Sequence, residues 1–220
     1  FSSNNSLKIG TNPALTLVHG GVSILGNNAA ATNRTFNGLS LLGAGSLAVT
    51  SGNNQNASAS VGSIRRGVIG AAVDLGLTNT GSGVASSSKT TANNGTTGIM
   101  GGWATVNGTS WAVSGTGTGP FNVSALPSTG YVSNTLTAGS NADITSSFVA
   151  PSGRTTSTIR FNTPVAATAT LAGTNNVTSG GILVTPNVGA NASAFTGGTI
   201  AAPKDQELFI QQFNTAGNLT

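Results

Sequence analysis

The chain has 220 residues, of which only 5% are charged: four acidic residues and eight basic ones. It has one histidine and no cysteine. Most active sites need two titratable groups with separated pKa values, or a nucleophile beside a base, so this composition favours a non-enzymatic protein without a cofactor. The lack of cysteine also excludes a disulfide scaffold and thiolate metal sites.

The basic residues are too dispersed for a nucleic-acid interface. The net charge is +4, and Arg65 and Arg66 are the only adjacent pair. Phosphate binding needs clustered Lys or Arg, so we expect no nucleic-acid partner.

No stretch approaches the ~20 apolar residues of a membrane-spanning helix, which predicts no membrane span in this segment. Residues 1–10 lack the charged start and apolar run of a signal peptide, so we expect that a signal was removed or that the chain is a piece of a longer protein.

Short alternating runs of apolar residues recur along the chain, separated by Gly, Asn, Ser and Thr. This period-two pattern predicts β-strands with one buried face. In chain order, the alternating pairs are Leu7 and Ile9, Leu15 and Leu17, Val22 and Ile24, Leu39 and Leu41, Leu47 and Val49, Ile159 and Phe161, Ala169 and Leu171, Ile182 and Val184, and Leu208 and Ile210. Helix-forming residues never accumulate at helical spacing, and residues 203–213 are predicted to end as a strand. Such short runs predict a sandwich, a barrel or a β-solenoid, and the Gly-, Asn- and Ser-rich corners favour the solenoid.

A longer internal repeat supports the solenoid. Three landmarks recur at a nearly constant spacing, namely Phe1 and Phe161, Gly20-Gly21 and Gly180-Gly181, and Phe36 and Phe195. The offset is 160 for the first two landmarks (161 − 1 and 180 − 20) and 159 for the third (195 − 36). This spacing predicts one solenoid segment over residues 1–220, made of one module of about 160 residues (1–160) and the start of a second (161–220).

The aromatic residues allow two interpretations. Trp103 and Trp111 lie in residues 97–113, and Tyr131 follows in the next segment. Together they could form a platform for a sugar ring. Packing is the favoured interpretation, because a coil built largely from Ala and Val gains much of its buried area from such side chains.

The few titratable residues offer weak candidate sites. His19 could ligate a metal only with partners from distant coils, and no Cys or second His is present to help. Asp143 could contribute to a calcium site, but a turn-capping role is favoured. Asp205 and Glu207 share one face of a strand at a separation that permits glycoside hydrolysis, although solvated surface charge is the favoured interpretation.

The sequence resembles bacterial proteins built from autotransporter-associated β-strand repeats, which are passenger-like surface proteins. The resemblance is carried by VGSIRRGVIGAAVDLGL (residues 61–77), by residues 90–113 and by residues 157–220, and GGWATVNGTSWAV (residues 101–113) is its most specific part. It implies a right-handed parallel β-helix that is exported and displayed at the cell surface or released as fibres. It implies no enzymatic activity and supplies no functional residues.

Together these features predict an all-β fold, a right-handed parallel β-helix shaped as an elongated rod. The expected function is that of a non-enzymatic structural protein of the bacterial cell surface or extracellular matrix, a stalk or filament subunit, with adhesion to surface glycans as a further role. Self-association or tandem stacking is expected through residues near both ends, namely Phe1, Leu7, Ile9, Leu208, Ile210 and Leu219. The alternatives are a carbohydrate-binding or carbohydrate-active β-helix that uses Trp103, Trp111 and Tyr131, and an ice-binding face rich in Thr.

The scarcity of charge also fits this architecture. In parallel coils in register, a charge repeated at one position lies about 4.8 Å from its copy and repels it, whereas Asn, Ser and Thr can bond along the stack. We therefore expect uncharged polar side chains to link neighbouring coils.

Overall fold

The computed structural model describes residues 12–204 and 206–220. It is nearly all β, with 49% strand and 3% helix, and its parallel coils stack as a β-solenoid of about eight turns. The predicted solenoid fold is therefore confirmed. Phe1, Leu7 and Ile9 lie outside the described residues. No helix in the described part of the chain is long and apolar enough to cross a membrane.

The chain forms two compact units. Unit 1 contains Phe1–Asn94, Ala104–Asn107 and Ala112–Ser124, and unit 2 contains Gly95–Trp103, Gly108–Trp111 and Ala125–Thr220. These boundaries differ from those of the proposed 160-residue module, whose tandem repetition stays a prediction.

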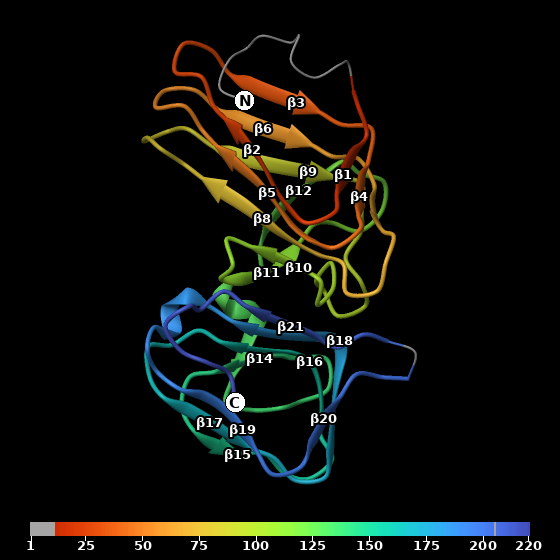
Figure 1. The fold of residues 1–220 in the computed structure, drawn as a ribbon, viewed down its shortest axis with the longest axis vertical. Helices are drawn as coiled ribbons and strands as arrows, with labels where there is room; N and C mark the ends of the chain where they lie inside the picture. The colour runs from red at the N-terminus through yellow and green to blue at the C-terminus, as the bar shows by residue number, and fades with distance from the viewer. Residues whose placement is uncertain (1–11, 205) are drawn as a thin grey trace. The chain divides into compact units, whose positions relative to one another are not determined.

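Within the described residues, unit 1 begins with three successive coils, each with three strands. The first coil holds β1 (Leu15–Leu17), β2 (Gly20–Leu25) and β3 (Thr32–Thr35); the second holds β4 (Leu39–Leu41), β5 (Ala44–Thr50) and β6 (Ala57–Ser60); the third holds β7 (Ile64–Arg66), β8 (Ala72–Thr78) and β9 (Ser86–Thr90). Figure 1 shows β2, β5 and β8 side by side with their arrows in one direction. Each coil thus adds one parallel strand to each of three strand series, β1-β4-β7, β2-β5-β8 and β3-β6-β9.

The core of unit 1 consists of columns of inward side chains. Val22, Leu47 and Leu75 lie in register on neighbouring strands, and Leu47 and Leu75 are fully buried. Because strand side chains alternate between faces, the predicted period-two pairs become the buried columns. Burial of each such side chain contributes about 1.5–3 kcal/mol.

After the third coil, unit 1 gains one parallel strand and one antiparallel strand. β10 (Ala104–Val106) continues the stack parallel to β8. β12 (Phe121–Ala125) pairs with β9 in the antiparallel direction, so the parallel series on this sheet ends there. Between them in the sequence lies β11 (Ser110–Val113).

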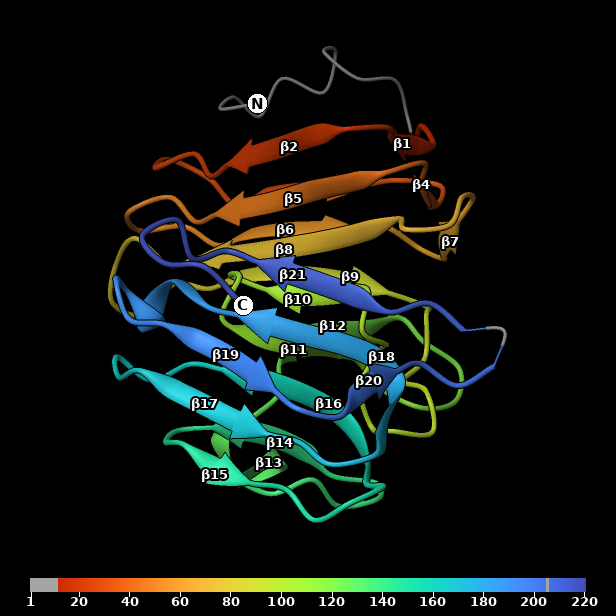
Figure 2. The same cartoon turned by 60° about the horizontal axis from the view of Figure 1, so that its bottom comes forward.

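Unit 2 is also built from stacked parallel coils, but its strands form two sheets and its coils have other lengths. Its strands are β13 (Tyr131–Ser133), β14 (Asn141–Ile144), β15 (Phe148–Val149), β16 (Thr155–Phe161), β17 (Ala167–Thr170), β18 (Thr174–Val184), β19 (Ser193–Thr196), β20 (Thr199–Ala201) and β21 (Phe209–Gln212), with short 3-10 helices at Ser128–Gly130 and Pro186–Val188. Figure 2 shows β15, β17 and β19 running parallel along one sheet. The long strand β18 pairs with β20 along its first part and with β21 along its last part.

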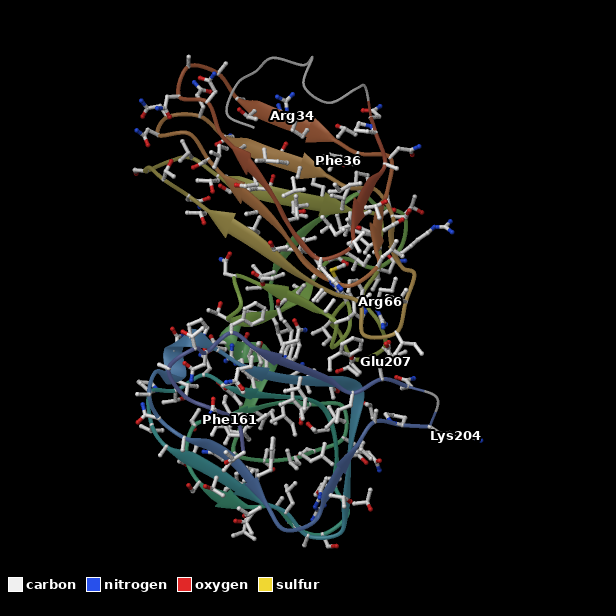
Figure 3. All side chains as sticks on the ribbon, viewed as in Figure 1. Arg34, Phe36, Arg66, Phe161, Lys204 and Glu207 are labelled. Carbon is white, nitrogen blue, oxygen red and sulfur yellow. The ribbon has the colours of Figure 1, made fainter. Side chains whose placement is uncertain are left out.

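Two register columns form the centre of the unit 2 core. One contains Ala142, Ile159 and Ile182, and its side chains are almost fully buried. Phe161 belongs to the second column and points into the interior of the unit (Figure 3), where its ring meets Phe195 edge to face at 5.3 Å. Such an aromatic pair adds about 0.5–1.5 kcal/mol beyond its buried area.

The strand predicted at the end of residues 203–213 is present as β21, but the burial of its residues is the reverse of the prediction. Phe209 is 7% exposed, whereas Leu208 and Ile210 are 40% and 58% exposed. Ile210 lies in register with the buried Ile182, and thus in the core column, yet β21 is the outermost strand of its sheet among the described residues. The alternation was recognised correctly, but the sequence did not show that this strand lies at the end of the stack.

Candidate functional site

One group of polar and aromatic side chains lies on the outward face of β13, β14 and β16 in unit 2. The strands are neighbours in the sheet, and Ser133, Asp143 and Arg160 occupy one register position. Asp143 and Arg160 alternate with inward apolar neighbours, which form part of the core. Parallel pairing therefore places a carboxylate directly beside a guanidinium.

Asp143 and Arg160 form a bidentate ion pair. Nε of Arg160 donates to Oδ1 of Asp143 at 3.1 Å, and Nη2 donates to Oδ2 at 2.7 Å. The third nitrogen, Nη1, donates to the backbone carbonyl of Thr109 at 3.1 Å. The side chains are 9% and 13% exposed for Arg160 and Asp143. This two-bond geometry is the strong form of an Arg–carboxylate contact.

The turn-capping role predicted for Asp143 is wrong. Asp143 lies within a strand and caps no turn; its carboxylate instead neutralises Arg160 on the next coil. Both carboxylate oxygens accept hydrogen bonds from the guanidinium. A carboxylate used in this way is a poor calcium ligand, because the cation would have to displace Arg160.

Tyr131 completes the group. The guanidinium carbon of Arg160 lies 3.6 Å from the centre of the Tyr131 ring, a cation–π contact. The Tyr131 hydroxyl lies 2.8 Å from Oγ of Ser110 and accepts a hydrogen bond from the backbone N–H of Trp111 at 3.2 Å. Burial raises the pKa of Tyr131, while the charge of Arg160 and these hydrogen bonds oppose the shift. The phenol therefore stays neutral and serves as a bridge between strands.

The two tryptophans differ in exposure. Trp111 has no exposed surface, and Trp103 is half-buried. The Trp111 ring packs so close to Gly181 that a Cβ there would lie 2.7 Å from Cη2 of the indole and 2.8 Å from Cα of Gly102. Trp111 offers no face to a sugar ring, and Arg160 covers one face of Tyr131. Trp103, Trp111 and Tyr131 thus do not form an exposed aromatic row.

The remaining titratable candidates are scattered. Asp74 in β8 accepts a hydrogen bond from Oγ1 of Thr105 at 2.7 Å, and His19 is exposed in the turn between β1 and β2. Glu207 is half-buried, but its predicted partner Asp205 lies outside the described residues. Within residues 12–204 and 206–220, no three His, Cys, Asp or Glu side chains are grouped to hold a metal ion.

Uncharged polar side chains link neighbouring coils in both units. In unit 1, Oγ of Ser58 donates to Oδ1 of Asn33 at 2.6 Å between register-paired residues. In unit 2, the register-paired Thr170 and Thr196 hydroxyls lie 3.2 Å apart. The pairs Thr174 with Thr199 (3.2 Å) and Asn141 with Thr158 (2.9 Å) follow the same rule. These contacts extend the backbone ladder into the side chains.

Arg160 and Ser110 were missed by sequence reasoning. A partial signal exists, because Asp143 lies between Ala142 and Ile144, and Arg160 lies between Ile159 and Phe161, so both charges occupy outward positions of apolar strands. Their pairing depends on a register that places residues 17 positions apart side by side (160 − 143). That register has no local sequence signal.

Comparison with protein-family models, with curated proteins and with solved structures finds no match to this chain.

Proposed function

We propose that this chain is a non-enzymatic structural segment of the bacterial cell surface or extracellular matrix, a β-solenoid stalk or filament subunit. The observation that carries the proposal is the use of outward polar side chains for bonds from coil to coil, as in Asn33 with Ser58 and Thr170 with Thr196. Such bonds stabilise each coil through its neighbours, so that stability accumulates along the stack. A protein that works through stiffness and extent needs this property.

The group around Arg160 supports the same proposal. Each nitrogen of the Arg160 guanidinium is engaged, because Nε and Nη2 donate to Asp143 and Nη1 donates to the Thr109 carbonyl, while the Tyr131 ring packs against the group. A general acid or base must be able to exchange a proton with substrate. A guanidinium paired with a carboxylate and a phenol with a raised pKa are better suited to holding strands together.

The extracellular setting rests on the resemblance to autotransporter-associated repeats and on the composition. Together with the weaker N-terminal coils, the matching segments cover most of the chain, and low charge with abundant Gly, Ser, Thr and Asn suits stacked coils. Surface glycans are the proposed binding partners in an adhesive role. Of the three aromatic candidates, Trp103 is the one to test first, because Trp111 is fully buried and Arg160 covers one face of Tyr131.

Ice binding is a second candidate, favoured by the outward threonine pairs of unit 2. Thr170 pairs with Thr196, and Thr174 with Thr199, on neighbouring coils. Paired hydroxyl and methyl groups of this kind could order water. Thermal hysteresis of the purified chain tests the idea, and its absence at high protein concentration eliminates this candidate.

The main proposal is tested on native material. Antibodies against the purified chain should label cell surfaces or extracellular fibres in immunogold negative-stain microscopy, with pre-immune serum as the control. Label confined to the cell interior, or to dispersed particles with no relation to surfaces or fibres, contradicts the proposal. Glycan-array binding that disappears in Trp103→Ala would instead favour the carbohydrate-binding alternative.

A further inference from the structure

The dipeptide Asn–Gly occurs three times in this chain, as Asn37-Gly38, Asn94-Gly95 and Asn107-Gly108. In this dipeptide the backbone nitrogen of the glycine can attack the side-chain amide of the asparagine. Glycine has no Cβ, so nothing shields the nitrogen and the backbone turns easily toward the side chain. The three pairs share the same local chemistry, and the structure determines how they differ.

Asn107 is held by both polar atoms of its amide. Its Oδ1 accepts a hydrogen bond from the N–H of Leu77 at 2.7 Å, and its Nδ2 donates to the Leu77 carbonyl at 3.2 Å. Leu77 lies in β8, so the Asn107 side chain is tied to a strand of the neighbouring coil. Its Cγ cannot turn toward the following nitrogen until both bonds open.

Asn94 and Gly95 are both engaged elsewhere. Oδ1 of Asn94 accepts hydrogen bonds from the N–H of Ser114 at 2.7 Å and from Oγ of Ser114 at 3.3 Å. The N–H of Gly95, which would supply the attacking nitrogen, donates to the Ile99 carbonyl at 2.7 Å. The amide and its attacker are therefore each fixed by other partners.

Asn37 lacks such restraints. It is exposed in the corner between β3 and β4, directly after Phe36 (Figure 3). Its side-chain amide makes no hydrogen bond with any residue that the structure describes. Neither the Asn37 carbonyl nor the Gly38 N–H bonds to a residue in the same described part of the chain. The peptide unit that must rotate for the attack is thus free of hydrogen bonds, and so is the amide that is attacked.

We propose that Asn37 is a site of spontaneous deamidation in the folded protein, whereas Asn94 and Asn107 are protected. The Gly38 nitrogen attacks Cγ of Asn37, its proton passes through solvent to Nδ2, the Cγ–Nδ2 bond breaks, and ammonia leaves as a succinimide ring closes. A water molecule then opens the ring at either carbonyl and leaves aspartate or isoaspartate at position 37. Each event replaces a neutral amide by a carboxylate, so it lowers the net charge of +4 by one.

The isoaspartate product alters the backbone of this corner. The main chain then passes through the Cβ of residue 37, which adds a methylene to it. The corner is anchored on both sides, because the N–H of Asn37 donates to the Pro13 carbonyl at 3.0 Å and the Gly38 carbonyl accepts from the N–H of Leu15 at 3.0 Å. The lengthened corner cannot keep both bonds without a shift. Isoaspartate should therefore loosen β4 from β1, its partner on the preceding coil.

Peptide mapping of the purified full chain by mass spectrometry tests the site. The folded chain is incubated at mildly alkaline pH in heavy-oxygen water, which labels only the carboxylates that form during the incubation. Conversion at Asn37 should be at least about tenfold faster than at Asn107, because two hydrogen bonds must open before Asn107 can react. In urea the three sites should convert at similar rates. Equal rates at Asn37 and Asn107 in the folded chain, or a difference that persists in urea, overturn the proposal.

Cation-exchange chromatography provides a second readout of the same site. The folded chain should slowly give a less basic species during the incubation. Asn37→Gln is the matched control, because its side chain keeps an exposed amide but needs a larger ring to react. The less basic species should form at least about tenfold more slowly in this variant. Its formation at an unchanged rate would overturn the assignment to Asn37.

The effect on the corner is tested with the separated products. Asn37→Asp carries the new charge on an ordinary backbone and should unfold at the same urea concentration as the fresh chain, since residue 37 is exposed. The isoaspartate fraction of the incubated chain should unfold at a lower urea concentration. Equal midpoints for all three overturn the predicted loosening of β4. These outcomes are independent of the proposed function, because the reaction needs only the folded chain and water.

Discussion

Arg160 and Asp143 face each other at one register position of neighbouring coils, joined by two hydrogen bonds of 3.1 and 2.7 Å. Their side chains are largely buried, with 9% of the Arg160 side chain and 13% of the Asp143 side chain exposed. The two residues lie on neighbouring strands of one sheet, so the ion pair links two successive coils. This gives the few charges of the chain a structural use.

Removing the carboxylate should destabilise unit 2. Asp143→Asn leaves the guanidinium of Arg160 largely buried without its counter-ion, which should lower the free energy of unfolding by about 3 kcal/mol. Urea unfolding followed by tryptophan fluorescence measures the effect, because Trp103 and Trp111 both belong to unit 2. The double variant Asp143→Asn/Arg160→Gln should recover part of the loss. Equal stability of the single and double variants would show that the charges are not coupled.

The phenol of Tyr131 should titrate above the ordinary tyrosine value of about 10. Burial raises its pKa, so the folded state holds the proton more tightly than the unfolded state. The resulting stability is fully present below the unfolded pKa and is lost as the pH rises through the folded pKa. Absorbance at high pH reports this group alone, since the chain has one tyrosine.

The titration has an internal reference and a matched variant. The same absorbance change in urea should occur at the ordinary value, and a coincident midpoint for folded and unfolded chains would contradict the shift. Tyr131→Phe removes the bonds to Ser110 and Trp111 but keeps the ring beneath Arg160. It should cost about 1 kcal/mol at neutral pH.

Gly181→Ala should disturb the packing of Trp111. The added Cβ would lie 2.7 Å from the indole and 2.8 Å from the Gly102 backbone, so the ring or the strand must shift. We expect a loss of about 1–3 kcal/mol, as for other overpacked cores, with a red shift of tryptophan emission. Gly95→Ala is the matched control, because its nearest neighbour would lie at an ordinary 3.5 Å. Similar effects of the two variants would mean that Gly181 is not tightly packed.

Charges repeated along a coil column should be unfavourable. Thr170→Asp/Thr196→Asp places two carboxylates on register-paired residues, so the double variant should lose about 1 kcal/mol more than the sum of the single variants. The excess should shrink in high salt, since Thr196 is exposed. Thr170→Asn/Thr196→Asn should show no such excess, because amides can bond along the stack. An additive aspartate pair would remove this explanation for the scarcity of charge.

The elements of this fold were largely predictable from local patterns. Pairs such as Leu39 with Leu41 and Ile182 with Val184 alternate in sequence and are buried in strands. Alternation is a property of the extended backbone itself, so it can be detected without knowledge of the partner strand. The expected burial of Leu208 and Ile210 was wrong, because burial depends on what covers a strand, and the local sequence of β21 does not specify its neighbours.

The site was less predictable. Asp143 was assigned to a turn and Arg160 was not singled out, although both alternate with core residues. Their contact exists because one coil of unit 2 brings residues 17 positions apart into register. A neighbouring pair of coils needs 23 positions (182 − 159), and the next needs 28 (210 − 182). A search for a fixed period cannot find partners across coils of such unequal length.

The amino-acid sequence by itself determined that this protein forms short strands with polar, glycine-rich corners, that little catalytic material is present, and that uncharged side chains are available to bond between coils. These are consequences of local backbone preference and composition. Only the tertiary structure decided which residues meet, since loop lengths and the register shift between Thr156 and Thr158 set the alignment of each coil on the next. It thereby placed Arg160 on Asp143, buried Trp111 against Gly181, and left Ile210 exposed at the end of the core column.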